Sequence, residues 1–332
     1  MKLWCDFHPS GPAAALLKAG VKGHEVLFAG EGHFPGEAEV ALGQPNPADI
    51  LAAKHLRWLH ISSAGYTKFD FPEFWQTIRA RQVLVSNSSS VFADPCAQHA
   101  LAMMLAFARA LPWALLRQFP VAANEAAGQA ARAPAVEPAP ADLPGWMSDP
   151  LRKKSFLLND QKVVLVGYGA IGRRLAELLA PLTAHVVGIR RRPRGDEPIP
   201  MAALSAMEPV LASADHVVNL LPHSAETTHF FNAARLGQIR PGAFFYNIGR
   251  GQTVDQPALI AALASGRLAA AYLDVTDPEP LPPDHPLWTA PNCFITPHTA
   301  GGHVNERARL VAHFLENLRR YEKGEPLVDA LG

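Results

Sequence analysis

A short apolar strand that runs straight into a glycine-rich turn constrains this chain more than any other feature. Residues 162–166 are too few and too rich in valine for a helix. They lead into Gly167, Gly169 and Gly172, and an amphipathic segment follows. A strand, a G-x-G-x-x-G turn and a helix in this order are typical of a dinucleotide-binding unit. The alternative is a structural turn that binds nothing.

Each glycine has its own place in such a unit. Gly167 permits the tight turn, Gly169 lets the backbone approach a pyrophosphate, and Gly172 lets the helix pack close to the strand. The first turn of the helix offers unpaired N–H groups and the positive end of the helix dipole to phosphates. We therefore predict a nucleotide site at this turn.

The fingerprint lies near the middle of a chain of 332 residues, which is long enough for two domains. Strand and helix signals alternate on both sides of it, as in parallel α/β sheets. We expect a Rossmann-type doubly wound parallel sheet in residues 99–302, with a dimerisation helix at its start. It should be inserted into a discontinuous, flavodoxin-like α/β substrate domain made of residues 1–98 and 303–332.

The expected elements follow from short apolar runs and from helical periodicity. In the first domain they are strands at 3–7, 25–28, 58–62 and 82–86, and helices at 13–19, 47–53, 71–79 and 304–323. In the second they are six strands, at 163–166, 185–189, 216–221, 243–248, 270–275 and 293–296, and helices at 173–179, 202–212, 233–238 and 257–264. Two further segments are a long apolar helix at 97–116, interrupted by Pro112, and an Ala/Pro-rich linker or insertion at 121–144.

Charge and cysteine content exclude several classes of protein. Thirty basic residues balance thirty acidic ones, which leaves no electrostatic footprint for nucleic acid or for a membrane. The three cysteines are far apart without C-x-x-C spacing, and the histidines form no H-E-x-x-H pair. We expect reduced thiols, no metal site and a cytoplasmic protein. Asp6 and His8 break the N-terminal apolar run, unlike a signal peptide.

Three polar loops follow predicted strands, at the edge where open α/β sheets bind ligands. Arg250 stands between two glycines, where its guanidinium could bind a carboxylate through two parallel hydrogen bonds. A solvated arginine in a turn is an equal alternative. Glu279 stands between two prolines in a stiff loop, a composition that is more often solvated surface. His298 lies on a loop framed by proline and glycine. Singly each is weak evidence, but together they suit one reaction.

That reaction is hydride transfer between a nicotinamide ring and a carbinol carbon. A proton must move on or off the oxygen at the same time, and histidine suits this role near neutral pH. A neighbouring carboxylate fixes the tautomer of the histidine, and an arginine can bind a substrate carboxylate and polarise the carbonyl. The nicotinamide supplies the redox chemistry, and the protein supplies position and charge.

The motifs G-Y-G-A-I-G, N-L-L-P, N-I-G-R-G, L-D-V-T-D-P-E-P-L and T-P-H-T-A-G-G, in this order, resemble the D-isomer-specific 2-hydroxyacid dehydrogenase family, in its glyoxylate/hydroxypyruvate reductase branch. The likeness is close over residues 160–306 and looser earlier. It implies that Arg250, Glu279 and His298 are the catalytic set, and that the enzyme is a homodimer built on the long helix. It further implies a substrate carboxylate site made of Ser63, Ala64, Gly65 and Arg250.

The fingerprint and the resemblance together give a set of cofactor-binding residues. Asp274 is implied to contact the nicotinamide carboxamide, and Pro222 to line the adenine pocket. The full set is Gly167, Tyr168, Gly169, Ala170, Ile171, Gly172, Arg190, Arg191, Leu221, Pro222, Ile248, Gly249, Asp274 and His298.

The strand at 185–189 ends in an arginine cluster, which bears on the choice of cofactor. An NAD-preferring fold places an acid there, about 20 residues beyond the glycines, to accept a hydrogen bond from the ribose. This chain has Arg190, Arg191, Arg192 and Arg194 instead. A guanidinium pairs strongly with a 2′-phosphate and gains little from a hydroxyl. We favour NADP(H), while NAD remains possible if the cluster is only an exposed basic turn.

The leading hypothesis is an NADP(H)-dependent oxidoreductase that interconverts a small 2-oxo acid and its D-2-hydroxy acid, of the glyoxylate/hydroxypyruvate type. One alternative is a dinucleotide-sensing, corepressor-like binding protein without turnover. Such a sensor need not keep Arg250, Glu279 and His298 together. Another is a formate or phosphite enzyme on the same scaffold, but formate enzymes of this family carry glutamine where this chain has Glu279.

Overall fold

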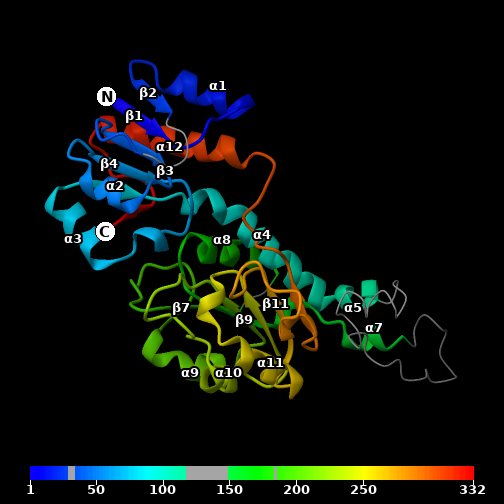
Figure 1. The fold of residues 1–332 in the computed structure, drawn as a ribbon. Coiled ribbons are helices and arrows are strands. Elements are labelled where there is room, and N and C mark those ends of the chain that lie inside the picture. The colour runs from blue at the N-terminus through cyan, green and yellow to red at the C-terminus, as the bar shows by residue number, and fades with distance from the viewer. Residues whose placement is uncertain (29–33, 117–148, 183–184) are drawn as a thin grey trace. The chain divides into compact units, whose positions relative to one another are not determined.

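The computed structural model describes residues 1–28, 34–116, 149–182 and 185–332 (Figure 1). The stretch at 121–144, predicted as a linker or insertion, lies outside the described residues. The chain divides into two compact units, Met1–Asp94 with Gly302–Gly332, and Pro95–Gly301. We call them the split unit and the central unit.

The split unit is built on a six-stranded sheet in the order β13-β5-β4-β3-β1-β2. All neighbours pair in parallel except β13, which is antiparallel to β5. The strands are β1 (Lys2–Cys5), β2 (Glu25–Phe28), β3 (Val40–Gly43), β4 (Trp58–Ile61), β5 (Leu84–Ser86) and β13 (Ala330–Leu331). The sequence did not predict β3, which is buried throughout and lacks alternation, or β13, which exists only through its pairing with β5.

Alternate side chains of β1 serve two different cores, one on each face of this sheet. Trp4 belongs to the core that includes residues of α2 (Pro47–Ala52) and α3 (Pro72–Ala80). Leu3 and Cys5 belong to the core with α1 (Gly11–Gly20) and α12 (Glu306–Glu322). The last helix of the chain thus packs beside the first one, as Figure 1 shows.

The central unit holds a seven-stranded, wholly parallel sheet in the order β12-β11-β10-β9-β6-β7-β8. Its strands are β6 (Lys162–Val166), β7 (His185–Arg190), β8 (Met201–Ala203), β9 (His216–Asn219), β10 (Ala243–Asn247), β11 (Leu268–Leu273) and β12 (Cys293–Ile295). The predicted doubly wound α/β architecture is confirmed. The predicted helix at 202–212 is wrong at its start, because β8 pairs with β7 there and Met201 lies against Gly188. Only Met207–Leu211 forms the α-helix, α9.

Helices cover both faces of the central sheet, and β6 again shows the alternation. Val164 and Val166 face a core with α9, α10 (Ala233–Gln238) and α11 (Gln256–Ala264). Val163 and Leu165 face a core with α8 (Ala170–Leu179) and α4 (Ser89–Ala108). Burial on both faces is typical of parallel sheets and explains why the strands read as continuous apolar runs.

The long helix predicted at 97–116 is two helices. α4 begins earlier, at Ser89, and ends at Ala108, and α5 spans Leu111–Leu116. Ala110 has a left-handed φ of 53° between them, and Pro112 cannot donate the hydrogen bond that would continue α4. By length and composition alone α4 could cross a membrane. Five of its buried residues, Ala97, Ala100, Met104, Phe107 and Ala108, pack in a core of the central unit, as in a core helix.

Candidate active site

The glycine turn lies at the point where the strand order of the central sheet reverses. β6 pairs with β7 on one side and with β9 on the other, so chains leave the sheet in opposite directions at its carboxyl end. Ligands of open α/β sheets bind in the crevice at such a switch point. Gly167 has a left-handed φ of 99°, and a Cβ on Gly172 would stand 2.8 Å from the carbonyl oxygen of Gly167. Both positions therefore require glycine.

The start of α8 completes this cradle. Gly169 caps the helix without a side-chain hydrogen bond, and a Cβ placed on it would meet no atom within 4 Å. The backbone there is open to a ligand, and the helix dipole favours an anion. The predicted residues Ala170 and Ile171 form the first turn of α8. The ring of Tyr168 belongs to the core shared with α4, so only its backbone is suited to a ligand.

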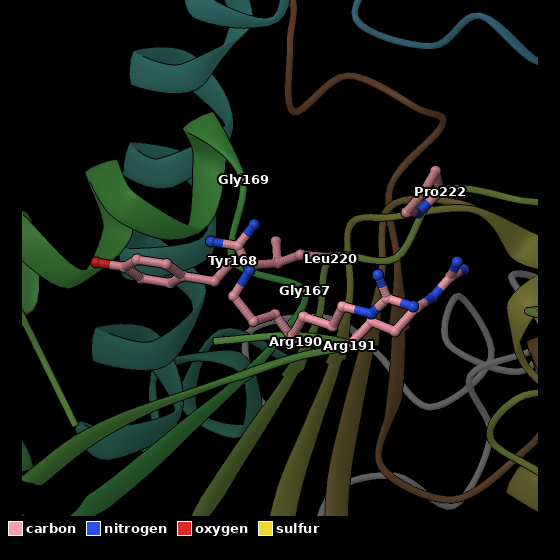
Figure 2. Close-up of a pocket in the computed structure, with 8 residues that line it drawn as sticks. Gly167, Tyr168, Gly169, Arg190, Arg191, Leu220 and Pro222 are labelled. Carbon is pink, nitrogen blue, oxygen red and sulfur yellow. The ribbon is translucent and has the colours of Figure 1, made fainter. Parts of the chain in front are cut away.

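A cavity of about 550 Å³ opens beside the glycine turn. Figure 2 shows the ring of Tyr168 pointing away from Pro222. Leu220 lines the cavity, whereas the predicted Leu221 packs against the core on the other face. The residues that line it are Gly167, Tyr168, Gly169, Arg190, Arg191, Arg192, Leu220 and Pro222.

Two of these arginines form ion pairs of different kinds. Arg190 donates to Glu197 over 2.9 Å, and the Glu197 side chain is only 6% exposed. Arg191 pairs with Glu226, and both of these side chains are 69% exposed. We call residues 190–197 the arginine turn. Its first and last residues, Arg190 and Glu197, form an ion pair with each other, whereas Arg191 pairs with the exposed Glu226.

Buried asparagines organise the loops that follow β9 and β10. The Asn219 amide donates to the Asn247 side chain over 3.0 Å and to Thr253 Oγ1 over 2.6 Å. Asn247 and Thr253 in turn donate to the carbonyl oxygen of Arg250, over 3.1 and 2.6 Å. Because Asn247 also accepts from the N–H of Gly249, the backbone on both sides of Arg250 is fixed. Neither Asn219 nor Thr253 was predicted as a site residue, although Asn219 is a polar residue that ends a buried apolar strand, which is a usable signal.

Asp274, at the end of β11, holds the loop that carries His298. Its carboxylate accepts from the Thr296 hydroxyl and from the N–H groups of Thr299 and Ala300, over 2.6, 2.9 and 3.0 Å. Its carbonyl oxygen accepts from the N–H of His298 over 2.9 Å. We call residues 296–300 the histidine loop. In this structure Asp274 is the acceptor that shapes the histidine loop, a role that the sequence alone did not indicate.

His298 and Glu279 lie in direct contact. Nδ1 of His298 donates to Oε2 of Glu279 over 2.8 Å, and Oε1 of Glu279 accepts from the N–H of Thr276 over 3.0 Å. This pairing leaves Nε2 as the nitrogen that can exchange a proton with a ligand. His298 also has a left-handed φ of 53°, an uncommon conformation for histidine that recurs at functional sites.

Arg250 is half-buried at the end of β10, in the same unit as Glu279 and His298. Its guanidinium donates to the carbonyl oxygen of Gly249 over 2.7 Å, a hydrogen bond that leaves other N–H groups for a ligand. Ile248 is buried in the core beside α4, and Gly249 lies close to the backbone of Leu221. The loop after β9, with Leu221, therefore contacts the loop after β10, with Gly249.

The predicted carboxylate loop, Ser63 to Gly65, belongs to the split unit and follows β4. Its oxygens are held from neighbouring strand ends. Gln44 Nε2 donates to Ser63 Oγ, and Asn87 Nδ2 donates to the carbonyl oxygen of Ala64, each over 2.7 Å. The Ser63 hydroxyl donates to the carbonyl oxygen of Gly65. The loop is therefore shaped by Gln44 and Asn87, neither of which was predicted as a site residue.

The described residues also bear on metals and thiols. Across residues 1–28, 34–116, 149–182 and 185–332, no group of three or more His, Cys, Asp or Glu is placed to hold a metal ion. All three cysteines are free and buried. Burial raises the pKa of the Cys5 and Cys96 thiols to about 12, so both stay protonated.

A dinucleotide cradle at a switch point, on the same sheet edge as a paired histidine and glutamate, defines an NAD(P)-dependent oxidoreductase. Comparison with known proteins supports this class and narrows it. Residues 143–300 match the NAD-binding domain of the D-isomer specific 2-hydroxyacid dehydrogenases. The chain is 30% identical over 303 residues to glyoxylate/hydroxypyruvate reductase B of Citrobacter koseri, covering 90% of this chain and 83% of that one. The chain belongs to the D-isomer specific 2-hydroxyacid dehydrogenase family.

Two further relatives agree with this membership. The human glyoxylate reductase/hydroxypyruvate reductase is 32% identical over 283 residues, which cover 84% of this chain and 78% of that one. The crystal structure of a D-isomer specific 2-hydroxyacid dehydrogenase from Xanthobacter autotrophicus Py2, in complex with NADPH and MES, superposes with a TM-score of 0.76. That match has 28% identity and covers 100% of this chain and 98% of the other. The family assignment made from the motifs is confirmed.

Proposed function

We propose that this 2-hydroxyacid dehydrogenase is an NADPH-dependent reductase of small 2-oxo acids of the glyoxylate/hydroxypyruvate type. The observation that carries the proposal is the cavity beside the glycine turn. Its lining includes Arg190, Arg191 and Arg192 and, among the described residues, no carboxylate. A dianionic 2′-phosphate suits such a lining better than a ribose hydroxyl does.

The relatives support both parts of the proposal. Two of them, from Citrobacter koseri and human, are named as reductases of glyoxylate and hydroxypyruvate. The Xanthobacter autotrophicus enzyme was solved with NADPH. NADPH preference also favours the direction of reduction, because cells keep that cofactor pool reduced.

The side chains of the central unit have separate tasks in this reaction. Bound NADPH would supply the hydride to the carbonyl carbon of the substrate. His298 donates a proton from Nε2 to the carbonyl oxygen as the hydride arrives, since Nδ1 is engaged by Glu279. Glu279 holds the ring in that orientation through this hydrogen bond. Arg250 binds the substrate carboxylate and polarises the carbonyl.

A further part of the predicted carboxylate site is the backbone of Ser63, Ala64 and Gly65, which belongs to the split unit. Its N–H groups are the donors that the family resemblance assigns to the substrate. Gln44 and Asn87 keep this loop in one conformation through their hydrogen bonds to Ser63 and Ala64. A loop held in this way has little conformational entropy to lose when it binds an anion.

The test is kcat/KM for NADPH and for NADH with a panel of 2-oxo acids, in the wild type and in Arg191→Ala. We expect the wild type to prefer NADPH, and Arg191→Ala to lower that preference by about 10- to 100-fold, the value of one charge-assisted pair. Arg174→Ala is the control, because Arg174 is a partly exposed arginine of the same unit that does not line the cavity.

Two results would contradict the proposal. The first is a wild type that prefers NADH, with a preference that Arg191→Ala does not change. The second is tight NADPH binding without turnover of any 2-oxo acid, which would favour the sensor-like binding protein instead.

A further inference from the structure

The arginine turn is organised around one buried carboxylate. Glu197 Oε1 accepts from Arg190 Nη1 over 2.9 Å, and both its oxygens accept from the N–H of Arg194, over 2.9 and 3.1 Å. Oε2 also accepts from the N–H of Gly195 over 2.8 Å, and Gly195 has a left-handed φ of 89°. One side chain therefore ties the end of β7 to the backbone of the turn that follows it.

Through these contacts Glu197 affects the cavity although it does not line it. Its hydrogen bonds hold the arginine turn, which carries Arg190, Arg191 and Arg192, the three arginines that line the cavity. Without its charge, Arg190 would lose its partner and stand beside two like charges, and two backbone N–H groups would lose their acceptor. The turn would then open, and Arg191 and Arg192 would no longer be held at the cavity.

Glu226 makes the opposite kind of contact. It pairs with Arg191 from the loop after Pro222, where both side chains are largely exposed. An exposed pair of this kind is weak and exchanges readily. A phosphate offers Arg191 a better partner, because it carries more charge and more acceptor oxygens.

We propose that Glu197 is the positioning residue of a 2′-phosphate subsite. It holds Arg190 and the turn so that Arg191 and Arg192 face the cavity, while Glu226 occupies Arg191 until the phosphate of the cofactor displaces it. Arg190, predicted from the sequence as a direct cofactor contact, is assigned to the scaffold of the subsite. This inference rests on the proposed NADPH preference and names the residues that create it.

The probes are adenosine 2′,5′-bisphosphate and 5′-AMP, which differ only in the 2′-phosphate, together with NADPH and NADH. Glu197→Gln keeps the size of the side chain but offers one acceptor oxygen in place of two. We expect Kd for adenosine 2′,5′-bisphosphate and for NADPH to rise about tenfold or more, as for the loss of a charged hydrogen bond. Kd for 5′-AMP and NADH should change less than about twofold, since neither reaches the subsite.

Two companion variants keep this test specific. Glu316→Gln is the matched control, because Glu316 also accepts from arginines, Arg319 and Arg320, but lies in the split unit. Glu226→Gln should instead tighten binding of NADPH and adenosine 2′,5′-bisphosphate by about two- to fivefold at low salt, because the competitor for Arg191 is weakened. Thermal unfolding checks that each variant is folded.

The outcomes separate this inference from the proposed function. If the wild type binds adenosine 2′,5′-bisphosphate no better than 5′-AMP, the NADPH preference itself is wrong. If the wild type discriminates and Glu197→Gln discriminates equally well, the positioning role is overturned. Equal weakening of all four ligands by Glu197→Gln also overturns it, because that pattern means general damage to the nucleotide site.

Discussion

The histidine loop and the arginine turn stand at the same edge of the central sheet and are built on the same device. In each, a carboxylate with little exposure accepts hydrogen bonds from the backbone of a loop, Asp274 in one and Glu197 in the other. They differ in what the loop presents. The histidine loop presents a proton donor paired with Glu279, and the arginine turn presents fixed positive charge.

This difference teaches that turnover and cofactor choice are separable in this molecule. The proton donor and the arginines lie on different loops, each with its own acceptor, and within the described part of the chain the two loops share no hydrogen-bond partner. Effects of changes at sites without shared partners are additive as a rule. Substitutions in the histidine loop should therefore change the rate, and substitutions in the arginine turn should change the cofactor ratio.

The largest effect should come from His298→Ala. Loss of the proton donor should lower kcat by about 10²- to 10⁴-fold, the range of general acid catalysis. The ratio of Kd for NADPH to Kd for NADH should stay within about twofold, because the arginine turn is untouched. Steady-state kinetics and equilibrium titration measure the two quantities, with His55→Ala, an exposed histidine of the split unit, as control. A variant that kept substantial activity would show that His298 is not the donor.

Asp274→Asn should have the next largest effect. An amide offers one acceptor oxygen where the carboxylate serves three donors, so at least one buried N–H or hydroxyl loses its partner. We expect the free energy of unfolding to fall by about 1–3 kcal/mol. Displacement of His298 by a fraction of an ångström to about 1 Å should lower kcat by up to about 10²-fold.

Denaturant unfolding and steady-state kinetics measure these two effects, with Asp284→Asn, an exposed aspartate, as control. If Asp274→Asn altered the preference for NADPH over NADH and left kcat intact, the separation of rate from cofactor preference between the two loops would be wrong.

The smallest effect concerns pH. Hydrogen bonds from the N–H groups of Arg194 and Gly195 and from Arg190 hold the pKa of Glu197 at about 2, below its ordinary value of 4.5. A depressed carboxylate pKa means that the stabilising charge is present above the ordinary value and is lost only as the pH falls towards 2. Glu197 therefore stays ionised between about pH 5 and pH 8, and the arginine turn keeps its shape there.

Any change of cofactor preference in that range should come from the 2′-phosphate, whose second pKa is near 6. We expect the wild-type preference for NADPH to decline about two- to fivefold between about pH 7.5 and pH 5.5 as the phosphate loses one charge. Equilibrium titration at several pH values measures it. In Glu197→Gln the preference should be low at every pH, and a wild-type loss of more than about tenfold would point to titration of the turn itself.

The sequence predicted much of this molecule because its signals were local. The glycine spacing, the apolar strand at 162–166 and the alternation of strands and helices required only neighbours along the chain to be interpreted. Local patterns did not predict strands that form only by pairing with a strand distant in the sequence. Met201–Ala203 is a strand because β7 lies beside it, and Ala330–Leu331 is a strand only because of β5.

The candidate site shows the same division. Arg250, Glu279 and His298 could be selected from their motifs, since each stands in a recognisable loop after a strand. Asn219, Asp274 and Glu197 support those loops through hydrogen bonds to backbone groups, and the sequence carries no record of which backbone group a side chain will reach. Arg190 and Arg191 are neighbours in the chain, yet one is tied to a buried acid and the other to an exposed one.

By itself the sequence determined that this chain folds around a dinucleotide-binding unit, because turn geometry and strand periodicity are local properties of the backbone. Its ordered motifs placed the chain, by resemblance, among the 2-hydroxyacid dehydrogenases. Only the tertiary structure decided which carboxylates hold the loops at the edge of the sheet. That choice depends on distances between strand ends far apart in the chain, and those distances are set by the packing of the whole sheet.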